Sequence, residues 1–227
     1  MRLKFPSYFF SFNKKNIYIV TIFVAMILIP FYFTNSKNSI ERKITAKQIA
    51  ELIKKENYKK VIDYINDENM SLEDTAYFHF LVGRAYQEEK SNYKALASYS
   101  KAISKNPKFY KAFINRGLVK GALKDYQGSI KDMQMAISIN PKLPEPYLNI
   151  GVTQASLNKP IDAIENFIYA ISINPKYINA YRNLGITYFY QDQKELACLN
   201  WQKAINLGEN SIKDWKKEYC KWKLLQE

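Results

Sequence analysis

Four glycines recur at one fixed interval and constrain the fold of this chain more than any other feature. They are Gly83, Gly117, Gly151 and Gly185, each 34 residues from the next, in a chain of 227 residues that has only seven glycines. Each lies in a stretch whose other residues favour a helix, where glycine costs about 0.5–1 kcal/mol relative to alanine. The same cost at the same phase in four places indicates a repeated packing requirement, which we interpret as a close approach between two helices.

The residues around these glycines repeat at the same interval and define four units, at 76–109, 110–143, 144–177 and 178–211. With each unit numbered from 1 to 34, position 8 is the glycine, position 20 is small, position 24 is large and position 27 is alanine. We expect helix A over roughly positions 2–14 and helix B over roughly positions 18–30. The first three units carry Asn-Pro at positions 31 and 32, and proline cannot continue helix B. Position 20 is Ala95, Ser129, Ala163 and Ala197, and position 24 is Tyr99, Met133, Phe167 and Trp201.

Both ends of the repeated region depart from this pattern. The phase continues backward into residues 42–75, where Ile49 replaces the glycine, so we expect a degenerate first helix pair there. At the other end Gly208 replaces proline as the stop for the last helix B. Residues 212–227 predict a final helix, with Ser211 as its N-cap, that covers the exposed end of the stack. The apolar residues at helical spacing in this helix are Ile212, Trp215, Tyr219 and Trp222.

The N-terminal part of the chain has a different composition. Residues 1–16 form a basic and aromatic head, residues 17–34 an uncharged apolar stretch, and residues 35–41 a short polar linker. The apolar stretch is near the lower length limit for a transmembrane helix, and we interpret it as an uncleaved signal-anchor. A cleaved signal peptide and a buried helix of the soluble domain are the alternatives. Positive charges on the two sides nearly balance, but Lys14 and Lys15 adjoin the stretch and favour a helical domain on the non-cytoplasmic side of the membrane.

The chain is basic, with a formal net charge of +13. The first forty residues contribute +5 of it, and the rest is spread through the repeats without a dense block. We interpret these charges as solvated helix faces. A basic surface that meets anionic lipid, cell wall or an acidic partner is the alternative. The absence of a long Lys/Arg run argues against a nucleic-acid partner.

The residues that most often carry chemistry give little sign of catalysis. Cys198 and Cys220 lie in helical stretches without metal-binding spacing, so we expect buried free thiols, with a disulfide outside the cytosol as the alternative. The single histidine, His79, occupies position 4 of its unit, a packing position. No nucleophile–base pair, phosphate-binding loop or metal cluster appears, so we predict no catalytic residue, no metal, no cofactor and no enzymatic activity.

The period of 34, together with the small, aromatic, alanine and proline positions, resembles the tetratricopeptide repeat (TPR) family. The resemblance covers residues 76–211 well and residues 42–75 weakly. It implies a right-handed α-solenoid of helix-turn-helix repeats. Together with the apolar stretch and the final helix, the sequence predicts an all-α fold in which this solenoid ends in a C-terminal capping helix and is preceded by one transmembrane helix. The second unit departs from the pattern, because Arg116 stands at position 7 and Lys120 at position 11.

By the same resemblance, such arrays bind a peptide or a partner protein in a groove lined by helix A and rarely catalyse a reaction. Position 6 lies on a face of helix A that the core leaves free, and it is Asn115, Asn149 and Asn183 in the last three units. A side-chain amide donates and accepts at once, so one asparagine per repeat could clamp an extended backbone about every third residue. The alternative is that asparagine is simply frequent at this position in the family.

We expect apolar walls and cationic points around these amides. The apolar residues are Ile114, Leu118, Leu148, Val152, Ile186 and Phe189, and the cationic residues are Arg84, Lys111 and Arg182. Some members of the family grip a C-terminal carboxylate through a set of Lys, Asn and Arg. This chain lacks that set. The positions of its first Lys–Asn pair are occupied by Phe80 and Arg84 in the first unit, and by Ile114 and Leu118 in the second.

The sequence therefore predicts a single-pass, membrane-anchored scaffold or adaptor that binds a segment of a partner protein in the TPR groove. Two alternatives remain open: a secreted or periplasmic soluble adaptor after signal cleavage, and a basic-surface binder of lipid or nucleic acid.

Overall fold

The computed structural model describes residues 45–66 and 74–220, and within these ranges the chain forms eleven helices and no strand. The predicted head, membrane span and linker (1–16, 17–34 and 35–41) lie outside the described residues. None of the described helices has the length and apolarity that crossing a membrane requires.

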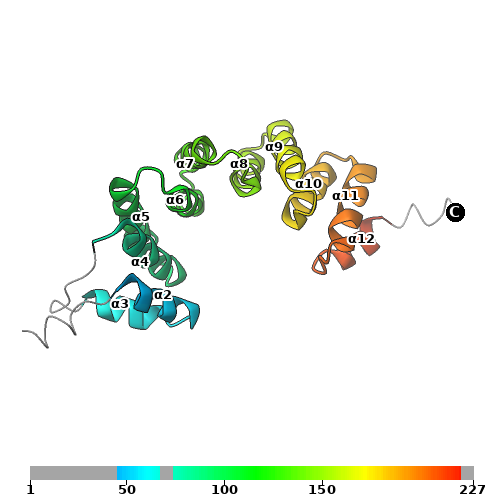
Figure 1. Cartoon of the computed structure of the whole chain (residues 1–227). Helices are drawn as coiled ribbons and strands as arrows, with labels where there is room; N and C mark the ends of the chain where they lie inside the picture. The colour runs from blue at the N-terminus through cyan, green and yellow to red at the C-terminus, as the bar shows by residue number, and fades with distance from the viewer. Residues whose placement is uncertain (1–44, 67–73, 221–227) are drawn as a thin grey trace, which may run out of the picture.

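The helices follow one another in pairs, and each predicted unit holds one pair. The A helices are α2 (Ala46–Lys54), α4 (Ala76–Glu88), α6 (Tyr110–Ala122), α8 (Pro144–Ser156) and α10 (Ile178–Tyr190). The B helices are α3 (Tyr58–Asn66), α5 (Asn92–Lys105), α7 (Tyr126–Ile139), α9 (Pro160–Ile173) and α11 (Lys194–Asn206), and α12 (Lys213–Tyr219) follows the last of them. Figure 1 shows the pairs side by side in a curved row, with α2 and α3 at one end and α12 at the other.

The curvature of the row places the A helices on its inner side. Each A helix packs against its own B helix, and each B helix from α5 to α9 packs against the next A helix. A helices of neighbouring units also contact one another (α4 with α6, α6 with α8, α8 with α10), whereas B helices do not. Accordingly α6, α8 and α10 lie along the inside of the curve in Figure 1 and α7, α9 and α11 along the outside.

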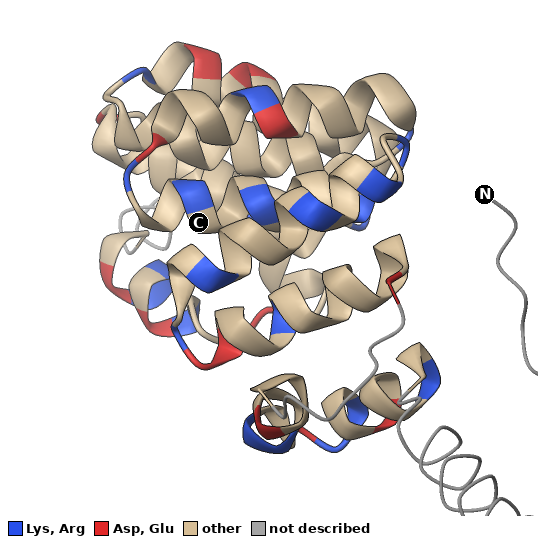
Figure 2. Ribbon diagram, turned by 90° about the vertical axis from the view of Figure 1, so that its left-hand side faces the viewer, with Lys and Arg blue, Asp and Glu red and all other residues tan. Residues whose placement is uncertain are grey.

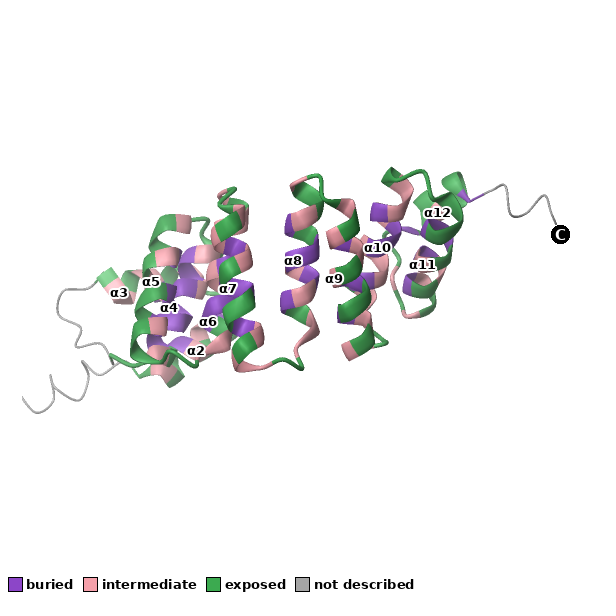
Figure 3. Cartoon of the chain, turned by 90° about the horizontal axis from the view of Figure 1, so that it is seen from above, coloured by how far each residue is buried: buried purple, intermediate pink, exposed green. Residues whose placement is uncertain are grey.

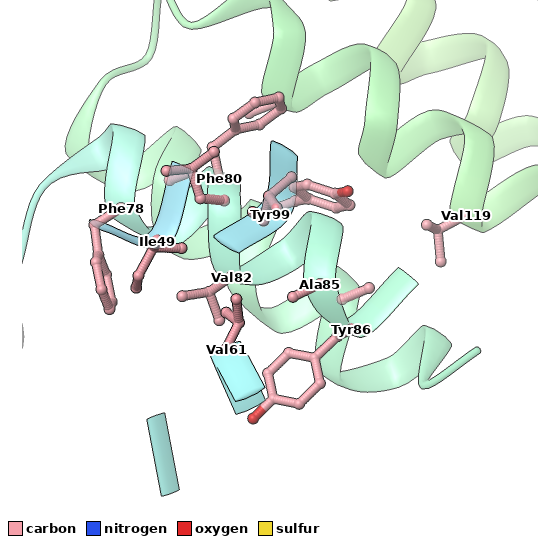
Figure 4. Close-up of a cluster of buried hydrophobic side chains, with 14 residues drawn as sticks. Ile49, Val61, Phe78, Phe80, Val82, Ala85, Tyr86, Tyr99 and Val119 are labelled. Atoms are coloured by element: carbon pink, nitrogen blue, oxygen red, sulfur yellow. The ribbon is translucent and has the colours of Figure 1, made fainter. Parts of the chain in front are cut away.

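The core is a series of local clusters between neighbouring helices. In Figure 3 the buried residues lie on the facing sides of the helices along the whole row. The first cluster joins Ile49 of α2 and Val61 of α3, both fully buried, to Val82 of α4 and Tyr99 of α5 (Figure 4). The N-terminal pair α2–α3 is therefore packed onto the array, although its helices are shorter than the others.

The repeated glycine lies directly beneath the large side chain at position 24 of the same unit. A Cβ added to Gly151 would lie 2.6 Å from the Phe167 ring, and one added to Gly185 would lie 2.4 Å from the Trp201 indole. Both distances are far shorter than ordinary van der Waals contact. The close helix approach expected at position 8 is therefore present, and the ring of helix B rests on the backbone of helix A.

The turn between helix A and helix B has the same form in every pair. One residue with positive φ follows each A helix, always at position 15 of the 34-residue phase: Glu56, Lys90, Lys124, Asn158 and Asp192. In the second unit the Lys124 N–H bonds the Gly121 carbonyl and the Asp125 N–H bonds the Lys120 carbonyl, which is a Schellman motif. Because Glu56 repeats this turn, residues 45–66 share the design of the later units.

The connections between units use the expected Asn-Pro pairs. Asn106, Asn140 and Asn174 are the C-caps of α5, α7 and α9, and all three have extended backbone angles. Their side-chain oxygens accept from the backbone N–H two residues on, at 3.0–3.3 Å. The proline between these groups has no N–H of its own, so the helix ends and the chain turns toward the next A helix.

The C-terminal helix caps the stack, but its start differs from the prediction. The N-cap of α12 is Ile212, not Ser211, because the Ser211 backbone N–H and hydroxyl both bond the Glu209 carboxylate. The helix packs its aromatic residues onto the last unit, with Trp215 6.2 Å from Trp201 between ring centroids. Trp222 and the rest of residues 221–227 lie outside the described part of the chain.

The expectation of two free thiols was wrong, because Cys198 of α11 and Cys220 form a disulfide. When α12 folds back over α11, with Tyr219 4.8 Å from Phe189 between ring centroids, it brings the two Cα atoms to 5.9 Å. This separation lies within the range that a disulfide can bridge. The cap is thus held by a covalent link as well as by aromatic packing.

His79 is a buried packing residue, and its environment makes stability depend on pH. Its Nε2 lies 2.6 Å from Asp74 Oδ1. A hydrogen bond from Lys105, and then the one to His79, lowers the pKa of Asp74 to about 2. Burial lowers the pKa of His79 below its ordinary value and outweighs the opposing effect of the Asp74 hydrogen bond.

We predict that the free energy of unfolding decreases as the pH is lowered from about 7.5 to about 5.5. The unfolded chain takes up the imidazole proton near pH 6.5, whereas the folded chain resists it, so stability is lost by at most about 1.4 kcal/mol per pH unit. Urea denaturation at several pH values measures this slope. His79→Phe should flatten it, since His79 is the only histidine. Tyr181→Phe, at the same position of the fourth unit, should leave it unchanged; an unaltered slope in His79→Phe contradicts the assignment.

Candidate functional site

The inner face of the curve carries the three predicted asparagines, and all three are half-buried. The Asn115 amide donates to the Lys111 carbonyl at 2.8 Å, and the Asn183 amide donates to the Asn179 carbonyl at 2.8 Å. Asn149 Nδ2 lies 4.0 Å from Met133 Sδ, a weak contact. Within the described residues each amide keeps one N–H and its carbonyl oxygen without a partner. These atoms are the groups that a backbone ligand requires.

Two of the predicted apolar wall residues belong to the core instead. Ile114 is 3% exposed and Leu148 is 7% exposed, so the prediction that they line an open groove was wrong. Both stand at position 5, where Phe80 of the first unit is buried as well, and both belong to core clusters between helices. Leu118 and Val152, at 37% and 41% exposed, do present apolar surface.

The remaining predicted residues divide between the surface and internal contacts. Ile186 and Phe189 are half-buried, and the Phe189 ring lies 5.6 Å from that of Trp201, beneath the cap. Arg182 forms an ion pair with Glu209 at 3.2 Å. Arg84 and Lys111 form no ion pair within the described part of the chain, so these two cations are available to a ligand.

Arg84, Lys111 and Asn115 come together at a hollow between α4 and α6, which we call the first hollow. It has a volume of about 560 Å³. Its aromatic lining includes Tyr77 and Phe109, which were absent from the predicted set. Tyr77 stands at position 2, on the same helix face as the asparagines, and could have been found by that spacing. Phe109 lies in the connection between units, where the helical period gives no signal.

Val152, Asn183 and Ile186 come together at a second hollow, between α8 and α10, which we call the second hollow. It has a volume of about 520 Å³, and Phe167 and Tyr190 also line it. Tyr190 is 72% exposed and stands at position 13, again on the asparagine face. Asn149 lies on α8 in the unit between Asn115 and Asn183. The three amides therefore run from one hollow to the other.

The two cations that break the repeat pattern in the second unit both pair with one buried carboxylate. Arg116 forms two hydrogen bonds with the buried Asp132 carboxylate, at 2.7 and 2.9 Å, and one with Ser100. The Lys120 ammonium lies 2.8 Å from the same carboxylate. Asp132 is 2% exposed, so it is a buried anion with two cationic partners. The corresponding pair in the third unit is neutral, with Asn166 donating to Gln154 at 2.9 Å.

No metal site is present among the described residues. They contain no group of three or more His, Cys, Asp or Glu that could hold a metal ion. Figure 2 shows Lys and Arg at intervals on several helices, interspersed with Asp and Glu. What the inner face offers is hydrogen-bonding amides, exposed apolar side chains and two unpaired cations, which are the elements of a binding surface.

One of the units matches the model of a known protein family. Residues 110–143, the second unit, match the tetratricopeptide repeat model. The other helix pairs have the same arrangement as this unit. No curated protein sequence matches the chain.

Solved structures with the same fold extend this likeness along the chain. A crystal structure of MamA is 24% identical, with a TM-score of 0.55, and the match covers 66% of this chain and 84% of that one. The Pseudomonas aeruginosa pilF structure is 15% identical, with a TM-score of 0.64 and coverage of 73% and 76%. YrrB, described as a TPR protein with an unusual peptide-binding site, is 19% identical, with a TM-score of 0.60 and coverage of 79% and 94%. The TM-scores show that the chain shares the fold of these three proteins.

Proposed function

We propose that this protein is a membrane-anchored scaffold that binds an extended segment of a partner protein along the inner face of its TPR solenoid. The observation that carries the proposal is the row Asn115, Asn149 and Asn183, whose amides keep an N–H and an oxygen free between two hollows. TPR solenoids bind peptide or protein partners, and YrrB, which shares the fold, is described as having a peptide-binding site.

The amides would recognise the backbone of the partner. Each free N–H can donate to a peptide carbonyl, and each side-chain oxygen can accept from a peptide N–H. In Asn115 and Asn183 the other N–H is bonded to the carbonyl four residues earlier, which restrains the side chain before a ligand arrives. A restrained amide loses less entropy on binding than a mobile one. Affinity then comes from the backbone of the ligand, and selectivity comes from the hollows.

We predict that Asn149→Ala combined with Asn183→Ala weakens partner capture by at least about thirtyfold. The loss of two hydrogen bonds at about 1 kcal/mol each accounts for that factor. Capture from detergent extracts by the tagged full-length protein measures the effect, and the melting temperature should not change.

Asn200→Ala is the matched control, because the Asn200 amide donates to the Leu196 carbonyl at 2.8 Å but lies on the outer helix α11. Capture should survive this change. Unchanged capture in the double variant rules out the asparagine row as the binding element.

For the location, we propose a single-pass membrane protein with the helical domain on the non-cytoplasmic side. Residues 17–34 would form the anchor, and Lys14 and Lys15 favour a cytoplasmic N-terminus. The Cys198–Cys220 disulfide supports the same orientation, because disulfides persist in oxidising compartments and are rare in the cytosol.

We predict that the full-length protein in isolated membranes has no thiol available to a maleimide reagent after denaturation, and two after reduction. Gel shifts with a polyethylene-glycol maleimide count the thiols, and Cys198→Ser should show one without reduction. Two reactive thiols before reduction contradict the proposed orientation.

Alkaline carbonate washing of the same membranes should leave the protein in the pellet, whereas a secreted or periplasmic soluble adaptor would be released.

A further inference from the structure

We propose that the first hollow binds an acidic side chain that adjoins an aromatic or large aliphatic one, within an extended segment of the partner protein. This inference rests on the proposed function, since it names the chemistry of the ligand that the inner face selects.

The apolar part of the ligand would lie on an aromatic surface in the first hollow. Phe80 of α4 and Phe109, in the connection before α6, are 5.0 Å apart between ring centroids. The Tyr77 ring stacks near Phe80 at 6.4 Å and is 49% exposed. Phe109 is the N-cap residue of α6, so this surface forms where α4 meets the start of the next helix A. Phe80 is only 7% exposed, so the accessible part of this surface is Tyr77 and the half-buried Phe109. Covering exposed aromatic surface is a favourable way to anchor a ligand.

The acidic part of the ligand would pair with the two cations at the same hollow. Arg84 and Lys111 both line it, and among the described residues no Asp or Glu does. Neither cation forms an ion pair within residues 45–66 and 74–220. Lys111 interacts with Glu145 of α8 only through space: burial raises the pKa of that carboxyl and Lys111 opposes the rise. A ligand carboxylate could therefore accept two hydrogen bonds from the Arg84 guanidinium without displacing a partner.

The second hollow is uncharged, whereas the first is cationic. This difference would fix which end of a bound segment lies at which hollow. None of the described residues that line the second hollow is charged, and its walls include Val152, Phe167, Ile186 and Tyr190 around the amide of Asn183. It therefore suits an uncharged apolar side chain. The hollows lie two units apart, on the order of 20 Å when neighbouring helices pack about 10 Å apart. An extended chain covers this distance in about six residues. The ligand pattern is an acidic–apolar pair and a further apolar residue about six positions away.

Three synthetic peptides test this pattern on the full-length protein in detergent. The first is acetyl-Ser-Phe-Glu-Ser-Ala-Ser-Ala-Ser-Leu-Ser-amide with an uncharged fluorophore, and the other two carry Gln or Lys in place of Glu. Fluorescence anisotropy at low salt should give a dissociation constant about tenfold lower for the Glu peptide than for the Gln peptide, and weakest binding for the Lys peptide. The advantage of Glu should shrink at high salt, because ions screen partly exposed charges.

Protein variants locate the effect at the first hollow. Arg84→Gln combined with Lys111→Gln should abolish the difference between the Glu and Gln peptides while retaining binding of the Gln peptide. Lys131→Gln combined with Lys203→Gln removes the same charge from the outer helices α7 and α11 and should preserve the tenfold difference.

Three outcomes overturn the inference: equal affinity for the Glu and Gln peptides, a preference for Lys, or no binding of any peptide at about 1 mM. None of them overturns the proposed function, which is tested separately by partner capture with the Asn149 and Asn183 changes. If capture also fails to depend on those asparagines, both proposals fall.

Discussion

The contact between the glycine of helix A and the large side chain of helix B is the interaction on which the rest of this structure depends. The ring of Tyr99, Phe167 or Trp201 lies against a helix backbone that has no Cβ at the point of contact. Glycine destabilises helix A relative to alanine, but its missing side chain lets the ring of helix B come close and bury its apolar surface. Because the contact recurs every 34 residues, it fixes how each helix A rotates against its helix B.

That rotation decides which residues remain available for binding. With position 8 turned into the helix pair, position 6 of the same helix falls on the inner face of the curve. Asn115, Asn149 and Asn183 therefore follow one line, and the contacts between neighbouring A helices form the hollows beside it. The two ends of the array differ in structure. At the N-terminal end, α2 and α3 are joined by the same positive-φ turn as the four later helix pairs. At the C-terminal end, a disulfide joins the residue after α12 to α11.

The local period predicts what is repeated, and it fails where the path of the chain is not periodic. The helix bounds follow from glycine, alanine and Asn-Pro, because these residues act within one unit. Ile114 and Leu148 both stand at position 5, where Phe80 is buried as well, so their burial belongs to the repeated packing, which the assignment of position 5 to the groove overlooked. The Cys198–Cys220 link depends on α12 folding back, and Phe109 reaches the first hollow from a connection. Asp132 pairs with Arg116 and Lys120, the two residues of the second unit that depart from the repeat pattern, and this pairing was not evident from either residue alone.

A double-mutant cycle on Gly151 and Phe167 tests the central contact most directly. Gly151→Ala should destabilise the protein by about 1–3 kcal/mol, because the new Cβ overpacks the ring. In a Phe167→Leu background the same change should cost at least about 1 kcal/mol less, since the smaller side chain leaves room. Gly121→Ala is the control, because its Cβ would meet only the Ser129 side chain, at 3.3 Å, and it should be neutral or stabilising. Urea denaturation of the four proteins should give this coupling; strictly additive free energies would contradict the account.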